Sequence, residues 1–264
     1  MNAGIPEALQ PLFEDYLLTI DQSLPGLLAA FYLEGSLALG AFNERWSDID
    51  FVGVLSRHCT KQEVETLEAI HHRLQSAYPR WQWQGEYLCW EDWVQSGQGR
   101  TLSLTYHAGR IQPRTQLDLH TSVTSWTLKH HGLALRGPDP RHLALVVDWG
   151  VLLAQIQRNL NTYWASFATQ PQRMAWLLTD YGIQWAVLGV LRPWYTLQER
   201  DIASKTQAVG YALTRLPHRW HRLIREALHI REQTKGSFYP SRIGRAIEAV
   251  RFVRYVIHAC NAKP

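Results

Sequence analysis

The chain has 264 residues, of which 46% are hydrophobic and 19% are charged, a composition typical of globular proteins. No run of about 18 apolar residues appears and the N-terminus has no basic segment, so neither a membrane span nor a signal peptide is expected. The formal net charge of +4 and the pI near 9.0 favour anionic ligands such as nucleoside triphosphates or nucleic acid.

The first half of the chain alternates between helical and strand patterns. Residues 5–20 and 60–77 have apolar side chains at helical spacing, and the second stretch starts with Thr60 and Glu63, the pattern of a capping box. We expect strands at residues 27–33, 48–55, 81–90 and 102–107, whereas the pattern at 117–121 is ambiguous.

The run Arg136-Gly137-Pro138-Asp139-Pro140 predicts a boundary, because neither a helix nor a strand continues through two nearby prolines. Beyond it every periodic segment is helical, and we expect breaks between the segments, including one at Arg192-Pro193. The expected helices are 143–167, 174–191, 205–213, 219–232 and 242–259. The sequence therefore predicts an α+β fold, with a mixed sheet and helices over residues 1–140 and an all-α helical bundle over 141–264.

The most informative motif joins a tight turn to a pair of carboxylates. Gly35-Ser36 follows an apolar stretch, and Ser47-Asp48-Ile49-Asp50 opens the next stretch, with Ser47 eleven residues after Ser36. Strand residues alternate between faces, so Asp48 and Asp50 are expected to project from the same side. Neighbouring carboxylates repel each other unless a cation lies between them, and Mg²⁺ prefers such oxygen ligands together with substrate phosphates. The backbone N–H groups after Gly35 and the hydroxyl of Ser36 are expected to face phosphate.

This G-S-x(11)-D-x-D pattern after an apolar strand resembles that of the nucleotidyltransferases with a polymerase-beta-like catalytic core. Within that superfamily the chain is most similar to the bacterial aminoglycoside adenylyltransferases of the streptomycin/spectinomycin type. Residues 133–138 resemble the end of the family's first domain, and residues 191–196 and 202–205 resemble part of its helical second domain. The resemblance implies transfer of AMP from ATP to a hydroxyl of an aminoglycoside or aminocyclitol antibiotic, with two Mg²⁺ ions, pyrophosphate release and resistance as the outcome.

The resemblance also implies roles for individual residues. Asp48 and Asp50 would hold the metal ions, and Glu86 would contact the acceptor and take the proton of its hydroxyl, a role in which position matters more than pKa. Glu91 and Asp92 compete with Glu86 for this role, but we expect both in a solvated loop. Ser47 is equally suited to capping its own segment. The nucleotide-binding set would be Gly35, Ser36, Ser47, Arg192 and Lys205.

The family binds the amines of the antibiotic with acidic residues early in the helical domain. Here residues 170–184 contain a single acid, Asp180, which is therefore the candidate for substrate binding. The family also has an Asp-x-Asp near a position where this chain has Asp118-Leu119-His120. His120 departs from that pattern, and we interpret it as a partly buried structural histidine.

Other side chains have simpler interpretations. His71-His72 and His130-His131 lack the spacing of metal ligands and are expected at the surface. Three widely spaced cysteines argue against a disulfide framework or a zinc site and fit a reducing cytoplasm. The chain has twelve tryptophans, for which core packing is the main interpretation and stacking on adenine or on a sugar the alternative; Trp81, Trp83, Trp90 and Trp93 cluster near the third strand.

Two further functions stay open alongside the antibiotic enzyme. One is a toxin or antitoxin that nucleotidylates tRNA or a protein, which the basic pI favours. The other is a nucleotide-binding regulatory module without turnover, against which three intact carboxylates argue. The main hypothesis makes the chain a cytoplasmic monomer with ATP and a small molecule as partners, and without nucleic acid or membrane.

Overall fold

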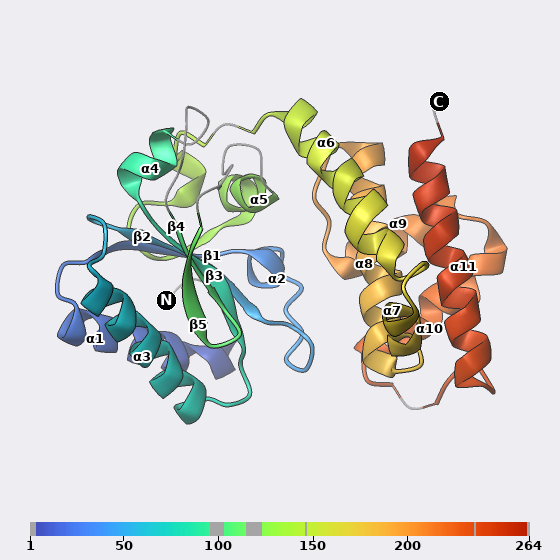
Figure 1. Ribbon diagram of the computed structural model, residues 1–264, viewed down its shortest axis with the longest axis horizontal. Helices are drawn as coiled ribbons and strands as arrows, with labels where there is room; N and C mark the ends of the chain where they lie inside the picture. The colour runs from blue at the N-terminus through green and yellow to red at the C-terminus, as the bar shows by residue number, and fades with distance from the viewer. Residues whose placement is uncertain (1–3, 96–102, 115–122, 146, 235, 263–264) are drawn as a thin grey trace. The chain divides into compact units, whose positions relative to one another are not determined.

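The computed structural model describes residues 4–95, 103–114, 123–145, 147–234 and 236–262 (Figure 1). The chain divides into two compact units, residues 1–148 and 149–264, so the division falls eight residues (148 − 140) after the expected boundary. Within the described ranges, no helix combines the length and the apolar character that crossing a bilayer requires.

The first unit is built on one six-stranded mixed sheet with the strand order β5-β4-β3-β2-β1-β6. The strands are β1 (Leu28–Leu33), β2 (Ile49–Leu55), β3 (Trp83–Cys89), β4 (Ser103–His107), β5 (Arg110–Arg114) and β6 (Leu133–Arg136). β2 and β3 run parallel, and every other neighbouring pair is antiparallel. The four expected strands are confirmed, whereas β5 and β6 were not predicted.

The helices of the first unit are α1 (Gln10–Ser23), α2 (Gly35–Ala38), α3 (Lys61–Ala77), α4 (Trp90–Gln95) and α5 (Val123–His131), with 3₁₀ turns at Glu7–Leu9 and Pro140–His142. The predicted capping box is present, because Thr60 accepts from the Glu63 N–H while the Glu63 carboxylate accepts from the Thr60 N–H. The short helices α2, α4 and α5 were not predicted, since four to nine residues carry too little periodicity.

Helices cover both faces of the sheet, and strand alternation sorts its side chains between two cores. Helices α1 and α3 pack together on one face (Figure 1), where Ile49 and Phe51 of β2 join the larger core. Val52 and Val54 of β2 belong to the second core, which includes side chains of α4 and α5. Asp50 shares the parity of Val52, so this acid belongs to the face that carries the second core.

A buried network of polar side chains under the sheet corrects the expected surface position of one histidine. His71 is fully buried, although we expected it at the surface; His72 beside it is exposed. The His71 Nε2 lies 2.7 Å from the Tyr87 hydroxyl, which lies 2.7 Å from the Tyr16 hydroxyl. No local sequence pattern indicates this network, because its members come from α3, β3 and α1. The expectation holds for His130 and His131, both of which are exposed.

The second unit is entirely helical in its described residues, as expected. It contains α6 (Trp149–Asn159), a π-helical turn (Leu160–Trp164), α7 (Pro171–Trp176), α8 (Asp180–Glu199), α9 (Lys205–Arg215), a 3₁₀ turn (His218–Trp220), α10 (His221–Arg231) and α11 (Arg242–Asn261). Helix α8 is the centre of the unit, because it packs against α6, α9, α10 and α11.

The expected break at Arg192-Pro193 is wrong, since Pro193 lies inside α8. A proline in a helix removes one hydrogen bond to residue i−4 and crowds that residue's carbonyl. Here residue i−4 is Gly189, which packs so closely on Trp164 that a Cβ would lie 2.0 Å from the indole ring. Burial of most of α8 among four helices compensates for the lost hydrogen bond. This burial depends on tertiary packing, so the sequence around Pro193 does not indicate it.

Candidate active site

The turn after β1 packs directly against the acidic start of β2. Gly35 has φ +56°, and a Cβ built on it would lie 2.0 Å from Oδ2 of Asp50. Both the left-handed backbone and the lack of space require glycine at this position. The Glu34 N–H donates to the Asp50 carbonyl over 3.0 Å, which ties the turn to the strand through the backbone as well.

Ser36 presents a polar atom that its surroundings leave unsatisfied. Its Oγ is shielded from solvent and makes no hydrogen bond to any described residue. Such an atom costs free energy unless a ligand or water pairs with it. An anion that accepts from the hydroxyl next to the Gly35 turn would satisfy it, so the residues present fit a phosphate group.

The loop between α2 and β2 is held by side-chain to backbone bonds. The Asn43 N–H donates to the Ser47 Oγ over 3.0 Å, and the Ser47 N–H donates to the Asn43 carbonyl over 2.8 Å. Asn43 Oδ1 in turn accepts from the N–H groups of Arg45 and Trp46, which forms an Asx turn. Ser47 therefore holds the loop that precedes Asp48, and its role in nucleotide binding stays a prediction.

The candidate carboxylates lie on one face of two neighbouring parallel strands. Asp48 directly precedes β2, Asp50 is its second residue, and Glu86 lies on β3 opposite Val52. Asp50 and Glu86 are therefore diagonal neighbours, with Cα atoms about 8 Å apart for ideal strand dimensions. All three are half-buried. Within the described ranges they do not form a group whose oxygens all lie within 4.8 Å of one another.

This donor set fits a hard divalent cation. Carboxylate oxygens are the ligands that Mg²⁺ takes, usually one or two from the protein with the rest from phosphates and water. Asp48 and Asp50 match that demand, and the Gly35 turn that would hold the phosphates touches the Asp50 carboxylate.

The two candidate cations of the second unit have partners inside that unit. Lys205 opens α9, which Ser204 and Gln207 cap, and its Nζ lies 4.7 Å from the centre of the Trp185 ring. The Nε of Arg192 donates to the Ala203 carbonyl over 2.9 Å. These contacts give both side chains a structural role, and a role in phosphate binding stays a prediction.

Asp180, the candidate for substrate binding, belongs to an ion-pair network that the sequence did not reveal. Arg245 is 3% exposed and donates to Asp180 Oδ1 over 2.6 Å and to Glu226 Oε1 over 2.9 Å. Burial by itself raises the pKa of Glu226, but hydrogen bonds from Ser237 and Phe238 and the bond from Arg245 outweigh it, so this pKa is lowered. The Asp180 side chain is 53% exposed, so the carboxylate is still accessible to a cationic ligand.

The remaining candidates have mixed outcomes. Glu91 and Asp92 lie in helix α4 rather than in the solvated loop that we expected; Glu91 is exposed, but Asp92 is half-buried. Trp81, Trp83 and Trp93 are buried and Trp90 stacks on Trp93, which supports core packing. Asp118 and His120 lie outside the described residues.

Comparison with known proteins supports the family suggested by the sequence. Residues 160–258 match the family model of the aminoglycoside adenylyltransferase C-terminal domain. The chain is similar in structure to spectinomycin adenyltransferase AAD(9) from Enterococcus faecialis, solved with ATP and spectinomycin, with a TM-score of 0.70 and 14% identity over 96% of this chain and 99% of that chain.

At this identity the likeness to AAD(9) establishes the fold. A second solved structure, the CD-NTase CdnG of Bradyrhizobium diazoefficiens in complex with GTP, is 14% identical over 98% of this chain and 96% of that chain. Its TM-score is 0.29, which is too low to indicate a shared fold. No curated protein matches the sequence.

Proposed function

Because residues 160–258 belong to the aminoglycoside adenylyltransferase C-terminal domain family and the chain has the fold of a nucleotidyltransferase, we propose that this protein adenylylates an antibiotic. The reaction would transfer AMP from ATP to a hydroxyl of an aminoglycoside or aminocyclitol of the streptomycin or spectinomycin type. Such a modification in the cytoplasm would make the host resistant.

The packing of Gly35 against Asp50 is the observation that carries this proposal. The turn suited to phosphate and the strand suited to metal are in contact, and the adjacent Ser36 hydroxyl has no partner among the described residues. A protein that used this turn for folding alone would gain nothing from an unsatisfied buried hydroxyl. Phosphate bound beside a carboxylate-held cation explains both features.

The proposed reaction follows from the face that these residues share. Gly35 and Ser36 hold the triphosphate, and the half-buried Glu86 takes the proton from the acceptor hydroxyl. The acceptor oxygen forms a bond to the α-phosphorus while the bond from that phosphorus to the bridging oxygen breaks, and pyrophosphate leaves. Asp48 and Asp50 would hold two Mg²⁺ ions, which neutralise charge on the entering and leaving oxygens.

In the second unit we propose that Lys205 and Arg192 bind phosphate and that Asp180 binds an amine of the antibiotic. Lysine is a common point-charge partner for phosphate, and Asp180 is half exposed. Asp180 is exposed although Arg245 pairs with it, whereas Asp201 is half-buried and accepts from Tyr195.

The test is pyrophosphate release from Mg·ATP with a panel of acceptors: streptomycin, spectinomycin, kanamycin, a lincosamide and bulk tRNA. We expect release with streptomycin or spectinomycin. Asp50→Asn should abolish it, and Glu86→Gln should slow it by roughly 10²–10⁴-fold because the general base is lost. Glu91→Gln, which changes an exposed acid in helix α4 just after the strand of Glu86, is the matched control and should retain the wild-type rate.

A wild-type rate in Glu86→Gln would exclude Glu86 as the base. Bound ATP without pyrophosphate release for any acceptor would overturn the enzymatic proposal and favour a regulatory module.

A second candidate is nucleotidyl transfer to tRNA. One groove of the second unit favours it, because its lining includes Arg219, Arg251, Arg254 and His258 against a single acid, Glu248, an excess of basic residues suited to a phosphate backbone. Release with tRNA alone would select this function.

A further inference from the structure

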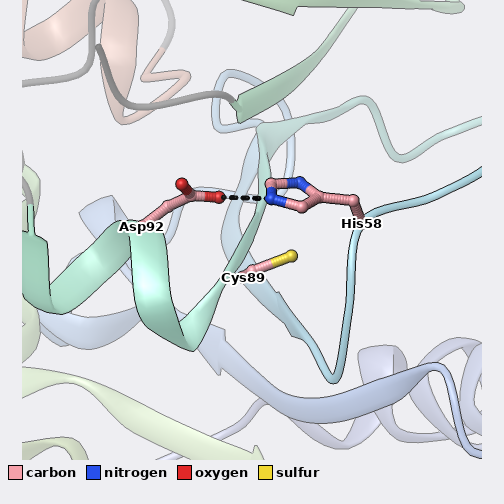
Figure 2. A group of neighbouring side chains, drawn as sticks. All are labelled: His58, Cys89 and Asp92. Carbon is pink, nitrogen blue, oxygen red and sulfur yellow. Dashed lines mark ion pairs between the residues drawn. The ribbon is translucent and has the colours of Figure 1, made fainter.

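Three side chains of different chemistry converge where β3 ends, away from the candidate active site. They are His58 from the loop after β2, Cys89 from the last position of β3 and Asp92 from α4 (Figure 2). One ligand atom of each lies within 4.8 Å of the other two. Within the described ranges, this is the one trio of acids, histidines and cysteines that meets this distance.

Parallel pairing brings the three residues together. Leu55, the last residue of β2, pairs with Cys89, the last residue of β3. The chain leaving β2 therefore carries His58 past the point where the chain leaving β3 turns into α4. Asp92, three residues after Cys89, faces back toward His58 from this helix (Figure 2).

The three atoms have the spacing of ligands rather than of hydrogen-bond partners. The His58 Nε2 and the Asp92 Oδ2 are 3.6 Å apart, which is too long for a hydrogen bond. In a tetrahedral zinc site, ligand bonds of 2.0–2.3 Å put neighbouring ligand atoms roughly 3.4–3.6 Å apart. The observed pair already has this separation, and the sulfur lies within 4.8 Å of both atoms, so a shift of about 1–1.5 Å at most brings it to the same spacing.

A second observation concerns the Asp92 Oδ2, whose contact with His58 is an ion pair too long for a hydrogen bond. The Asp92 Oδ2 is shielded from solvent and makes no hydrogen bond to the described residues. The side chain is 18% exposed overall, so this oxygen faces the protein and not the water. An unsatisfied buried carboxylate oxygen is costly, and a cation between it and His58 would remove the cost.

We propose that His58, Cys89 and Asp92 bind a transition-metal ion of the Zn²⁺ class, with water as the fourth ligand. A thiolate, an imidazole and a carboxylate are ligands for such ions, whereas Mg²⁺ prefers oxygen alone. His58 is 58% exposed and gives the ion a path from solvent. The three widely spaced cysteines argued against a zinc site, and the proposal departs from that expectation because it needs only one cysteine.

The ion would link the loop after β2 to the start of α4. Zn²⁺ bonds to the sulfur and displaces the thiol proton, so uptake releases one proton per ion. The site is independent of the adenylyl transfer proposed above, since Asp50 and Leu55 are five positions apart on β2, about 17 Å.

The experiment is a titration of the full-length chain with Co²⁺ as a spectroscopic probe, in excess Mg²⁺ so that the oxygen ligands of Asp48 and Asp50 are occupied. We expect one Co²⁺ per chain with a thiolate-to-cobalt absorption band and tetrahedral d–d bands, all removed by one equivalent of Zn²⁺. His58→Ala should weaken binding at least about tenfold, and Cys89→Ser should abolish the thiolate band.

Two variants serve as matched controls. Cys260→Ser removes a thiol in the second unit, and His107→Ala removes an exposed imidazole from β4; both should leave the band unchanged. The proposal is wrong if the wild-type chain gives no thiolate band, if His58→Ala binds Co²⁺ as tightly as the wild type, or if the band is lost in Cys260→Ser. Should Cys89→Ser fail to fold, His58→Ala still decides, because it changes an exposed loop residue.

Discussion

At the scale of single residues, the candidate site requires a glycine, which has no side chain, at position 35. Gly35 has no Cβ, and the space that a Cβ would fill is occupied by the carboxylate of Asp50. An alanine at Gly35 would both strain the left-handed backbone and displace Asp50. Gly40 separates these two effects, because its φ of +61° is close to the +56° of Gly35 but a Cβ added to it would meet nothing within 4 Å.

We predict that Gly35→Ala reduces pyrophosphate release by at least about 100-fold, because a displacement of about 1 Å among reacting groups has this effect. Gly40→Ala should cost only about 1–2 kcal/mol of stability for its left-handed backbone and keep its activity. Steady-state rates and thermal melting of both variants check this. Equal activity in the two variants would show that contact between the turn and Asp50 does not matter for the reaction.

How far the sequence predicts these residues depends on how local the pattern is. Gly35, Asp48 and Asp50 lie in one short stretch of the chain, so their spacing makes them candidates without knowledge of the fold. The trio of His58, Cys89 and Asp92 was missed, because a parallel strand pair joins residues that are 31 positions apart (89 − 58).

At the scale of elements, prediction succeeds at helix ends and fails where packing decides. The capping box of α3 needs contacts between Thr60 and Glu63 alone, and it is present as predicted. Helix α8 continues through Pro193 because neighbouring helices bury most of this helix, and His71 faces the core because α3 packs against the sheet. Neither the helical position of Pro193 nor the burial of His71 can be predicted from the neighbouring residues in the sequence.

Helix α3 should make the stability of the first unit depend on pH through His71. Burial, with a smaller contribution from His72, lowers the pKa of His71 to about 3. An unfolded histidine has a pKa near 6.5, so between these values the unfolded chain binds a proton that the folded chain does not. The free energy of unfolding therefore falls as pH decreases below 6.5, by about 2 kcal/mol between pH 7 and pH 5.

Urea unfolding at pH 7 and pH 5 measures this dependence. We expect His71→Gln to reduce the pH dependence by this amount, because glutamine does not titrate. His72→Gln, which changes the exposed neighbour, should leave it close to the wild-type value. If His71→Gln retained the full pH dependence, burial of a neutral His71 would not be its source.

At the scale of the whole molecule, the chain consists of two units, each with its own buried polar network. In the second unit, Glu226 is fully buried and accepts from Ser237, Phe238 and Arg245 over 2.6–2.9 Å. Arg245 also pairs with Asp180, so the network joins α10, α11 and α8. Because all of these residues belong to the second unit, the two cores should respond separately to a change in either.

We predict that Glu226→Gln destabilises the second unit by about 3–5 kcal/mol, because it removes one partner of a buried ion pair and leaves Arg245 with an exposed acid. Glu248→Gln is the matched control, since Glu248 also joins α11 to α10 by pairing with Arg222, but at a partly exposed site, where such a pair contributes about 1 kcal/mol. Amide hydrogen exchange should speed up across residues 149–264 in Glu226→Gln and stay unchanged in residues 1–148. Faster exchange in both units would mean that the chain unfolds as one cooperative body.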